Sequence, residues 1–302
     1  MQPNIYGPYT YTPITQRKGF KWPNGARVAL WVIPNIEYFH LSDPMPGTNN
    51  ERIAAANAKI PNVRNWSMRD YGNRVGIWRF MDVLSRYGIR ATVALNSDIC
   101  KYHPQIMEAG MKLGWEFMGH CQTNATRINE MPPEQEKDAI HDTLETIART
   151  MGKKPAGWLG AGLAETWSTL DFLIGEGCRY VADWVSDDLP YRMNVNGKTI
   201  HSIPYSLHCN DTPHFFDQKT TAEGFGEVIK RQFDWLYREG AESGRVMAVA
   251  LHPFVSGAPY RIGAVDAAFD YVCKHDGVWL ATGEEILNAY IASGGDDMTG
   301  HR

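Results

Sequence analysis

Acidic and imidazole side chains stand just after three apolar runs of this sequence. Glu37 comes shortly after RVALWVIPN, His120 directly follows WEFMG, and His252 directly follows RVMAVAL. A carboxylate can take a proton from water, and an imidazole can carry a proton near neutral pH. Hydrolysis of an amide needs these steps, together with stabilisation of the oxyanion and a proton for the leaving nitrogen. The question is whether one fold brings the three groups together.

Short apolar runs alternate with longer stretches of helical periodicity along most of the chain. Strands that alternate with helices form parallel βα units, and seven or eight such units close into a barrel. We therefore predict a single distorted (β/α) barrel of seven or eight strands, one domain over residues 1–302 with an irregular N-terminal arm at 1–24. Strands are expected at 27–35, 91–95, 115–119, 156–160, 179–183, 199–205, 245–251 and 278–281, and helices at 75–88, 103–113, 133–151, 167–176, 221–240, 264–274 and from 282.

Polar side chains at the C-terminal ends of these strands are expected to share one active-site mouth, because catalytic groups lie at that end of such barrels. The segment 40–68 is rich in Pro, Asn and Gly, and a loop of this length is expected to cover the mouth. The strand-end residues are Asn35, Glu37, Asn96, Asp98, His120, Asn124, Asp183 to Asp188, His208 to Asp211, and His252.

The composition argues against several classes of partner. The 302 residues carry a formal net charge of -4, and Lys and Arg are scattered, so we expect neither a nucleic-acid nor a membrane partner. Five cysteines, an odd number without a CxxC pair, indicate a reducing compartment. The N-terminal residues lack a signal-peptide pattern, and no run of about 18 apolar residues occurs, so a cytoplasmic protein is expected.

A series of motifs between about residue 20 and about residue 288 resembles the polysaccharide deacetylase (NodB-homology) superfamily. Within it, the chain looks most like the PuuE-type allantoinase branch, which opens a cyclic ureide. The motifs, in the family's order, are WPNGARVALWVIPNIEY, DYGNRVGIWR, YGIRATVALNS, WEFMGH, KPAGWLGAG, DWVSDDLPY, SIPYSLHCND, and ALHPFVSGAPYR followed by HDGVWLAT.

The chain departs from this family at the usual metal ligands. Deacetylases of the superfamily carry two adjacent aspartates and a His-x-x-x-His pair; Glu37 and Tyr38 match the first, and His120 and Asn124 match the second. Tyr and Asn are poor ligands for a catalytic zinc. By resemblance, the allantoinase branch works without a tightly held metal. We therefore expect no required cofactor; the alternative is one divalent metal such as zinc, held by Glu37 and His120.

Three residues are predicted to be catalytic. Glu37 matches the family's base position and would act as the general base. His120 would polarise the carbonyl or donate a proton, and His252 matches the histidine that assists the leaving group in the family. The alternative for each is a structural role. Cys121 follows His120 directly, but consecutive side chains at a strand end point apart, which argues against a thiol nucleophile.

Further residues are predicted to bind substrate. Asp70 and Arg74 could clamp a polar substrate or form an ion pair with each other. The amide of Asn124 suits the planar edge of an imide or ureide as well as it suits a loop cap. Trp158 lies between glycines that allow close approach of a ligand, although a barrel-strand Trp is more often core.

Two acidic positions complete the predicted substrate site. Asp187 and Asp188 are adjacent in DWVSDDLPY, where one is expected to form the turn and the other, taken as Asp188, to reach the mouth. Asp211 follows the sixth predicted strand. The sequence thus predicts a hydrolase of non-peptide carbon-nitrogen bonds that opens a small cyclic amide such as a ureide, hydantoin or imide. The alternatives are a metal-dependent N-acetyl deacetylase of carbohydrates and a non-catalytic small-molecule binding barrel. A small-molecule substrate and a homo-oligomer are expected as partners.

Overall fold

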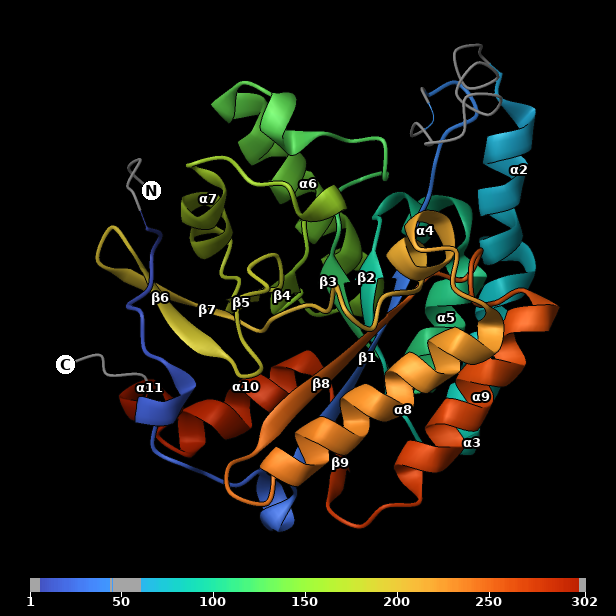
Figure 1. Cartoon of the computed structure of the whole chain (residues 1–302). Coiled ribbons are helices and arrows are strands. Elements are labelled where there is room, and N and C mark those ends of the chain that lie inside the picture. Colours follow the sequence, from blue (N-terminus) through green and yellow to red (C-terminus); the bar gives the residue numbers. More distant parts are fainter. Residues whose placement is uncertain (1–5, 44, 46–60, 299–302) are drawn as a thin grey trace.

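One curled, mostly parallel sheet forms the centre of the molecule (Figure 1). The computed structural model describes residues 6–43, 45 and 61–298. Neighbouring strands follow the order β6-β7-β5-β4-β3-β2-β1-β8, and β9 also pairs with β1. The strands are β1 (Val28–Ile36), β2 (Thr92–Leu95), β3 (Glu116–Gly119), β4 (Gly157–Trp158), β5 (Tyr180–Val181), β6 (Tyr191–Val195), β7 (Lys198–Ser202), β8 (Arg245–Leu251) and β9 (Val278–Leu280).

The sheet curls into a half-barrel, which confirms the predicted α/β barrel class. Strand β1 pairs with β8 along most of its length, with β9 near its start and with β2 at its end, always in parallel. Within the described residues, the gap between the β7 side and β8 holds one isolated β-bridge, between Asn210 and Ala250, and a backbone hydrogen bond from Val246 to Asp188. The barrel is therefore open along this seam.

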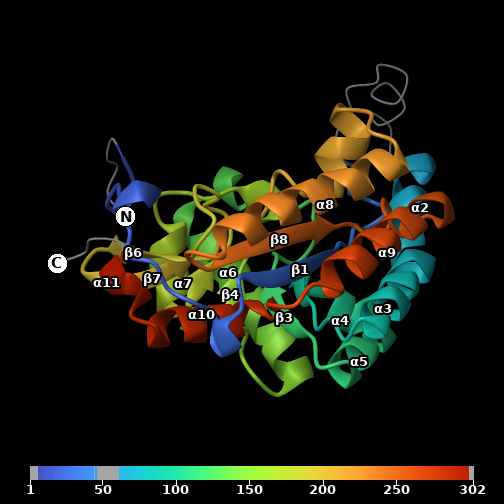
Figure 2. The ribbon, with the colours of Figure 1, turned by 60° about the horizontal axis from the view of Figure 1, so that its bottom comes forward.

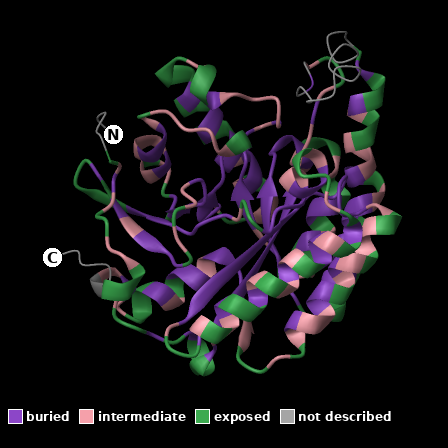
Figure 3. Ribbon diagram, in the orientation of Figure 1, coloured by how far each residue is buried: buried purple, intermediate pink, exposed green. Residues whose placement is uncertain are grey.

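Helices cover the convex side of the sheet, with α8 packed along β8 and α9 beside α8 and α3 (Figure 2). Their inner faces are buried and their outer faces exposed (Figure 3). The helices are α2 (Val63–Tyr71), α3 (Ile77–Arg86), α4 (Asp98–Tyr102), α5 (Pro104–Lys112), α6 (Pro133–Met151), α7 (Thr169–Gly175), α8 (Ala222–Glu239), α9 (Pro259–Cys273), α10 (Gly283–Ala292) and α11 (Gly295–Met298). Short π or 3-10 turns are η1 (Ile14–Gln16), η2 (Pro23–Gly25), η3 (Gly72–Gly76), η4 (Ile128–Glu130), η5 (Ala161–Leu163) and η6 (Pro213–Asp217).

The alternation of side chains along β1 separates two cores. Ala29, Trp31 and Ile33 pack with residues of the other strands on the concave side, whereas Leu30 and Val32 pack with the covering helices. Successive strand residues point to opposite faces of a sheet, so the apolar run on β1 is buried on both. This alternation also decides which strand-end residues face the mouth.

The first helical segment begins twelve residues earlier than the predicted start at Val75. Asn62 caps α2 by accepting from the Asn65 amide at 3.1 Å, and α2 runs through a π turn into α3. A Cβ at Gly76 would lie 2.0 Å from the Pro253 carbonyl oxygen, so glycine lets this turn contact the loop after β8. The helix is thereby packed beside the ends of β1 and β8.

Two further features differ from the sequence prediction. The structure has an antiparallel hairpin of β6 and β7, turned at Asn196 and Gly197 with φ of 52° and 80°, whereas the sequence predicted β7 alone. Both positive φ values suit an Asn-Gly turn. Part of the predicted covering segment, residues 46–60, lies outside the described residues, and its last part forms α2. None of the helices within the described ranges has the length and apolar character needed to cross a membrane.

Candidate active site

The alternation of strand side chains carries the three predicted catalytic residues to one mouth. Glu37 is an even number of residues from Trp31 and Ile33, so its side chain points to the same concave side of the sheet. Glu37, His120 and His252 directly follow the ends of β1, β3 and β8. The carboxylate of Glu37 acts electrostatically on both imidazoles, and its Oε1 lies 3.6 Å from Nε2 of His252. The structure thus brings the three residues together.

His252 is held between two carboxylates. Its Nδ1 donates to Oδ1 of Asp211 at 2.6 Å, and its backbone amide donates to Oδ2 of the same residue at 2.8 Å. The Thr212 hydroxyl lies 3.0 Å from Nδ1. Since Asp211 is fully buried, it fixes the ring with Nε2 directed toward Glu37. The predicted substrate-binding residue Asp211 is therefore a partner of His252.

The charge state of His252 follows from these neighbours. Burial by itself lowers the pKa of His252, but the carboxylate of Asp211 and, more weakly, that of Glu37 outweigh it and leave the pKa above its ordinary value. The ring is thus biased toward the imidazolium, which carries a proton on Nε2. It can serve as an acid at neutral pH.

Arg69 and Asn73 of the α2–η3 segment hold Glu37 from its other side. Nη1 of Arg69 donates to Oε2 of Glu37 at 3.3 Å, and Nδ2 of Asn73 donates to the Glu37 backbone carbonyl at 2.9 Å. The Arg69 guanidinium contacts two rings, 4.7 Å from the centroid of Phe39 and 4.8 Å from that of Phe254. Contact with both rings restricts the guanidinium, so it orients the carboxylate.

Asp70 and Arg74 were predicted to act as a pair. Each of them directly follows a residue that contacts Glu37, namely Arg69 or Asn73. Asp70 lines a small pocket together with Glu37, and its Oδ1 lies 4.0 Å from Nε2 of His103. Arg74 is exposed, and among the described residues no ion pair joins it to Asp70. Residues 69 and 73 share the inner face of the helix because they are four positions apart. The common face of residues 69 and 73 can be inferred from the sequence only when the helix is known to begin at residue 63.

His120 has a partner of another kind. Its Nδ1 lies 2.7 Å from the carbonyl oxygen of Leu159, and a carbonyl can only accept, so Nδ1 carries the proton. Burial lowers the pKa of His120, which is opposed by Glu37, by the Leu159 carbonyl and by the side chain of Asn124. Neutral His120 therefore presents Nε2 as an acceptor.

Asn124 and Tyr38 stand where the resemblance to deacetylases would place two metal ligands. The backbone N–H of Asn124 donates to the backbone carbonyl of Tyr38 at 2.9 Å, which connects the loop after β3 to the end of β1. Oδ1 of Asn124 is buried, and the Asn124 side chain interacts with His120. The Tyr38 ring stacks on Tyr102 with centroids 5.0 Å apart and planes 7° apart.

These residues do not fit the divalent metal that the deacetylase resemblance implies. The ring of Tyr38 is engaged by Tyr102, and Glu37 already pairs with the Arg69 guanidinium. In the described part of the chain, the group of metal-ligating side chains that converges lies elsewhere, at His141. Three firm protein ligands are the usual minimum for catalytic zinc. That no cofactor is required stays a prediction.

Trp158 and Cys121 face away from the mouth. Trp158 is fully buried and packs against Gly119 and Leu144, on the side of the sheet that α6 covers. Burial raises the pKa of the Cys121 thiol to about 12, which leaves almost no thiolate at neutral pH. The predicted contact of Trp158 with substrate is not supported, because the strand alternation turns Leu159 inward instead.

Asp187 and Asp188 also lie away from the catalytic group. Oδ1 of Asp187 accepts from the amides of Asp188 and Leu189, so Asp187 forms the turn. The Asp188 carbonyl accepts from the Val246 amide at 2.9 Å. Val246 precedes His252 by six strand positions, which corresponds to about 20 Å along β8. The predicted placement of Asp188 at the mouth is therefore wrong.

A pair of buried carboxyl groups follows β4 and β5, and the sequence did not single it out as a pair. Asp183 accepts from the Gly160 amide at 2.8 Å, and Glu165 accepts from the Trp184 indole at 3.0 Å. Burial raises the pKa of Asp183 to about 7, and burial together with Asp183 raises that of Glu165. A proton shared between the two carboxyl groups is the physical consequence.

A curled parallel α/β sheet with an Asp-His-Glu arrangement at its C-terminal edge defines a barrel hydrolase. The polysaccharide deacetylase family model matches residues 66–173, which include His120 and Asn124. The chain is thus similar to the polysaccharide deacetylase (NodB-like) superfamily in sequence over this segment and in fold over most of its length.

Three relatives illustrate the range of this superfamily. A crystal structure titled a probable polysaccharide deacetylase from Pseudomonas aeruginosa PAO1 is 27% identical with a TM-score of 0.79, over 90% of this chain and 93% of that chain. The crystal structure of PuuE allantoinase is 26% identical with a TM-score of 0.76, over 90% and 93%. A peptidoglycan deacetylase from Helicobacter pylori is 24% identical over 254 residues, 73% of this chain and 85% of the relative.

Proposed function

We propose that the protein hydrolyses a non-peptide carbon-nitrogen bond in a small cyclic amide, such as a ureide, hydantoin or imide, with its own acidic and basic side chains. The observation that carries the proposal is the chain of contacts from Asp211 through His252 to Glu37, continued by Arg69. It provides a carboxylate and an imidazolium beside each other, without the ligands of a metal centre.

Glu37 is assigned as the general base. Its carboxylate takes a proton from a water molecule while the water oxygen attacks the ring carbonyl carbon. Arg69 supports this role because its guanidinium, which contacts two rings, fixes the carboxylate. Arg69 acts through Glu37 and is thus a positioning residue.

His252 is assigned as the general acid. As the carbon-nitrogen bond of the tetrahedral intermediate breaks, Nε2 of His252 gives its proton to the leaving nitrogen, and the ring opens to a carboxylic acid and a free N–H group. Glu37 has then gained one proton and His252 has lost one. The separation of 3.6 Å between Oε1 and Nε2 would allow one proton transfer to restore both groups.

His120 and Asn124 are assigned to substrate recognition. Polarising a carbonyl requires a donor, whereas neutral His120 offers an acceptor at Nε2, so the acceptor role is favoured over the two roles expected from sequence. The buried Oδ1 of Asn124, whose side chain interacts with His120, adds a second acceptor. Two acceptors suit a substrate edge that carries N–H groups, as ureides, hydantoins and unsubstituted imides do.

A metal-dependent N-acetyl deacetylase is the second candidate, favoured by the names of two of the three relatives. The substitutions at Tyr38 and Asn124 speak against it. A non-catalytic binding barrel is the third, and the convergence of Glu37, His120 and His252 on one mouth speaks against it, because burying several ionisable groups is costly without a catalytic task. The cytoplasmic location, the homo-oligomer and the lack of nucleic-acid or membrane partners stay predictions.

A substrate panel separates the three candidates. Purified protein would be treated with a chelator, freed of it and assayed by chromatography with hydantoin, succinimide, allantoin and an N-acetylglucosamine oligomer, each with and without added zinc. Ring opening without metal is the expected result. Deacetylation of the oligomer that depends on zinc would establish the second candidate instead, and no turnover under any condition would contradict both enzymatic functions.

A further inference from the structure

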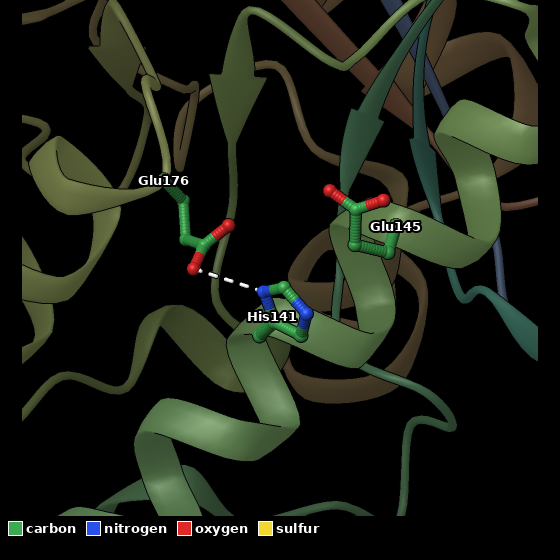
Figure 4. Close-up of side chains that lie close together, drawn as sticks. All are labelled: His141, Glu145 and Glu176. Atoms are coloured by element: carbon green, nitrogen blue, oxygen red, sulfur yellow. Dashed lines mark hydrogen bonds and ion pairs between the residues drawn. The ribbon is translucent and has the colours of Figure 1, made fainter.

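A second group of ionisable side chains lies where helices α6 and α7 meet, with one side chain exposed and two partly buried (Figure 4). His141 and Glu145 are four residues apart on α6, and Glu176 is the residue that follows α7. One ligand atom from each of the three lies within 4.8 Å of the others. Nδ1 of His141 and Oε1 of Glu176 are 3.0 Å apart. We call these three residues the α6–α7 cluster.

The α6–α7 cluster already holds a positive charge. The Lys154 ammonium lies 3.0 Å from Oε1 of Glu145 and 2.8 Å from Oε2 of Glu176. Both carboxylates are therefore directed at one cation position, which the Lys154 ammonium occupies.

We propose that the α6–α7 cluster is a binding site for a divalent transition-metal ion such as zinc, with Lys154 as the group that the metal replaces. Zinc binds imidazole nitrogen and carboxylate oxygen at about 2.0–2.2 Å, which places ligand atoms about 3–4 Å apart in a tetrahedral site. The observed spacing requires small side-chain rotations to reach this. A water molecule would supply the fourth ligand.

Charge and accessibility favour this exchange. Two carboxylates neutralise a divalent ion, and His141 contributes a neutral imidazole, so the loaded site carries no net charge. The His141 side chain is 53% exposed, so an ion can reach it from solvent. The Lys154 side chain is itself 37% exposed, and its flexible stem lets the ammonium move into water.

The bound metal would link α6, which packs on β3, to α7, which packs on β7. Glu176 lies beyond the end of α7, so the metal would fix the C-terminal end of this short helix to the middle of α6. A ligand that binds the folded state alone stabilises it by mass action. The site would strengthen the fold and would take no part in the proposed reaction.

Calorimetric titration of metal-free protein with zinc chloride tests the proposal. The Glu37→Gln background is used throughout, so that the mouth of the barrel contributes no carboxylate from this position. We expect one equivalent to bind, His141→Ala to weaken binding about tenfold or more, and Lys154→Met to tighten it about threefold, because a competing charge is removed. Glu134→Ala, an exposed change at the start of α6, is the matched control and should bind as the parent does.

Thermal unfolding supplies a second measurement. At a zinc concentration about 100 times the dissociation constant, the melting temperature of the parent and of Lys154→Met should rise by about 5 °C. That of His141→Ala should rise by about half as much or less at the same zinc concentration, because its site is at least tenfold weaker. Absence of zinc binding at millimolar concentration, equal binding by His141→Ala, or weaker binding by Lys154→Met would each overturn the proposal, whatever substrate the barrel hydrolyses.

Discussion

The histidines at the ends of β3 and β8 are buried to nearly the same degree, but their pKa values are shifted in opposite directions. His120 is 3% exposed and His252 is 8% exposed, yet the pKa of the first is lowered and that of the second is raised. The difference comes from the partner of Nδ1, which is the Leu159 carbonyl for His120 and the Asp211 carboxylate for His252. A carboxylate outweighs the cost of burying charge, and a carbonyl does not. Burial alone therefore does not decide which histidine can serve as the acid.

Glu37 faces both imidazoles, and its loss should have the largest effect. Glu37→Gln keeps the shape of the side chain but cannot take a proton from water, so kcat/KM should fall about a thousandfold. Steady-state kinetics on the best substrate of the panel measures this. Glu108→Gln, an exposed change on α5, is the control, and activity of Glu37→Gln within a few-fold of wild type would remove Glu37 as the base.

Arg69 should rank next, because it acts on the reaction through Glu37. Arg69→Met preserves much of the packing against Phe39 and Phe254 but removes the contact with Oε2, and kcat should fall about tenfold to a hundredfold with little change in KM. Arg69→Lys should recover part of the loss. A loss confined to thermal stability, with kcat unchanged in both variants, would show that Arg69 is structural.

His120 offers the sharpest contrast with His252. If Nε2 of His120 accepts a hydrogen bond from the substrate, His120→Gln keeps an acceptor near that position and His120→Leu removes it. We expect His120→Leu to raise KM about tenfold and His120→Gln to stay within about threefold of wild type. A fall of a thousandfold in kcat for both variants would instead make His120 a proton donor.

The carboxyl pair after β4 and β5 shows the effect of burial without a cationic partner. Burial raises the pKa of Asp183 from an ordinary 3.8 to about 7, so its contribution to stability is present below about pH 4 and is lost as the pH rises through about 7. In Asp183→Asn, the decrease in the free energy of unfolding between pH 5 and pH 8 should be smaller than in the wild type by roughly 2 kcal/mol. Urea unfolding at both pH values measures it, and equal pH dependence in both proteins would refute a shared proton.

The barrel class and the convergence of Glu37, His120 and His252 at one mouth were readable from the sequence, because strand alternation and the C-terminal rule of such barrels are local and general. The prediction for Trp158 was wrong because successive side chains on β4 point to opposite faces of the sheet, and that of Trp158 points toward α6. Arg69 and Asn73 were missed because the helix was expected to start at Val75, so their common face was not visible. The Asp183–Glu165 pair depends on a contact between two loops, and no spacing in the sequence indicates it.

The pH dependence of kcat/KM in the wild type and in Asp211→Asn tests the central claim most directly. His252 must be protonated to act as the acid, so activity should fall as the pH rises through its pKa, which Asp211 holds above the ordinary value. The substitution removes that charge, so the alkaline fall should move to lower pH by about one unit or more, with kcat/KM near pH 7.5 reduced about a hundredfold. An alkaline limb that does not move would contradict the assignment of His252 as the acid.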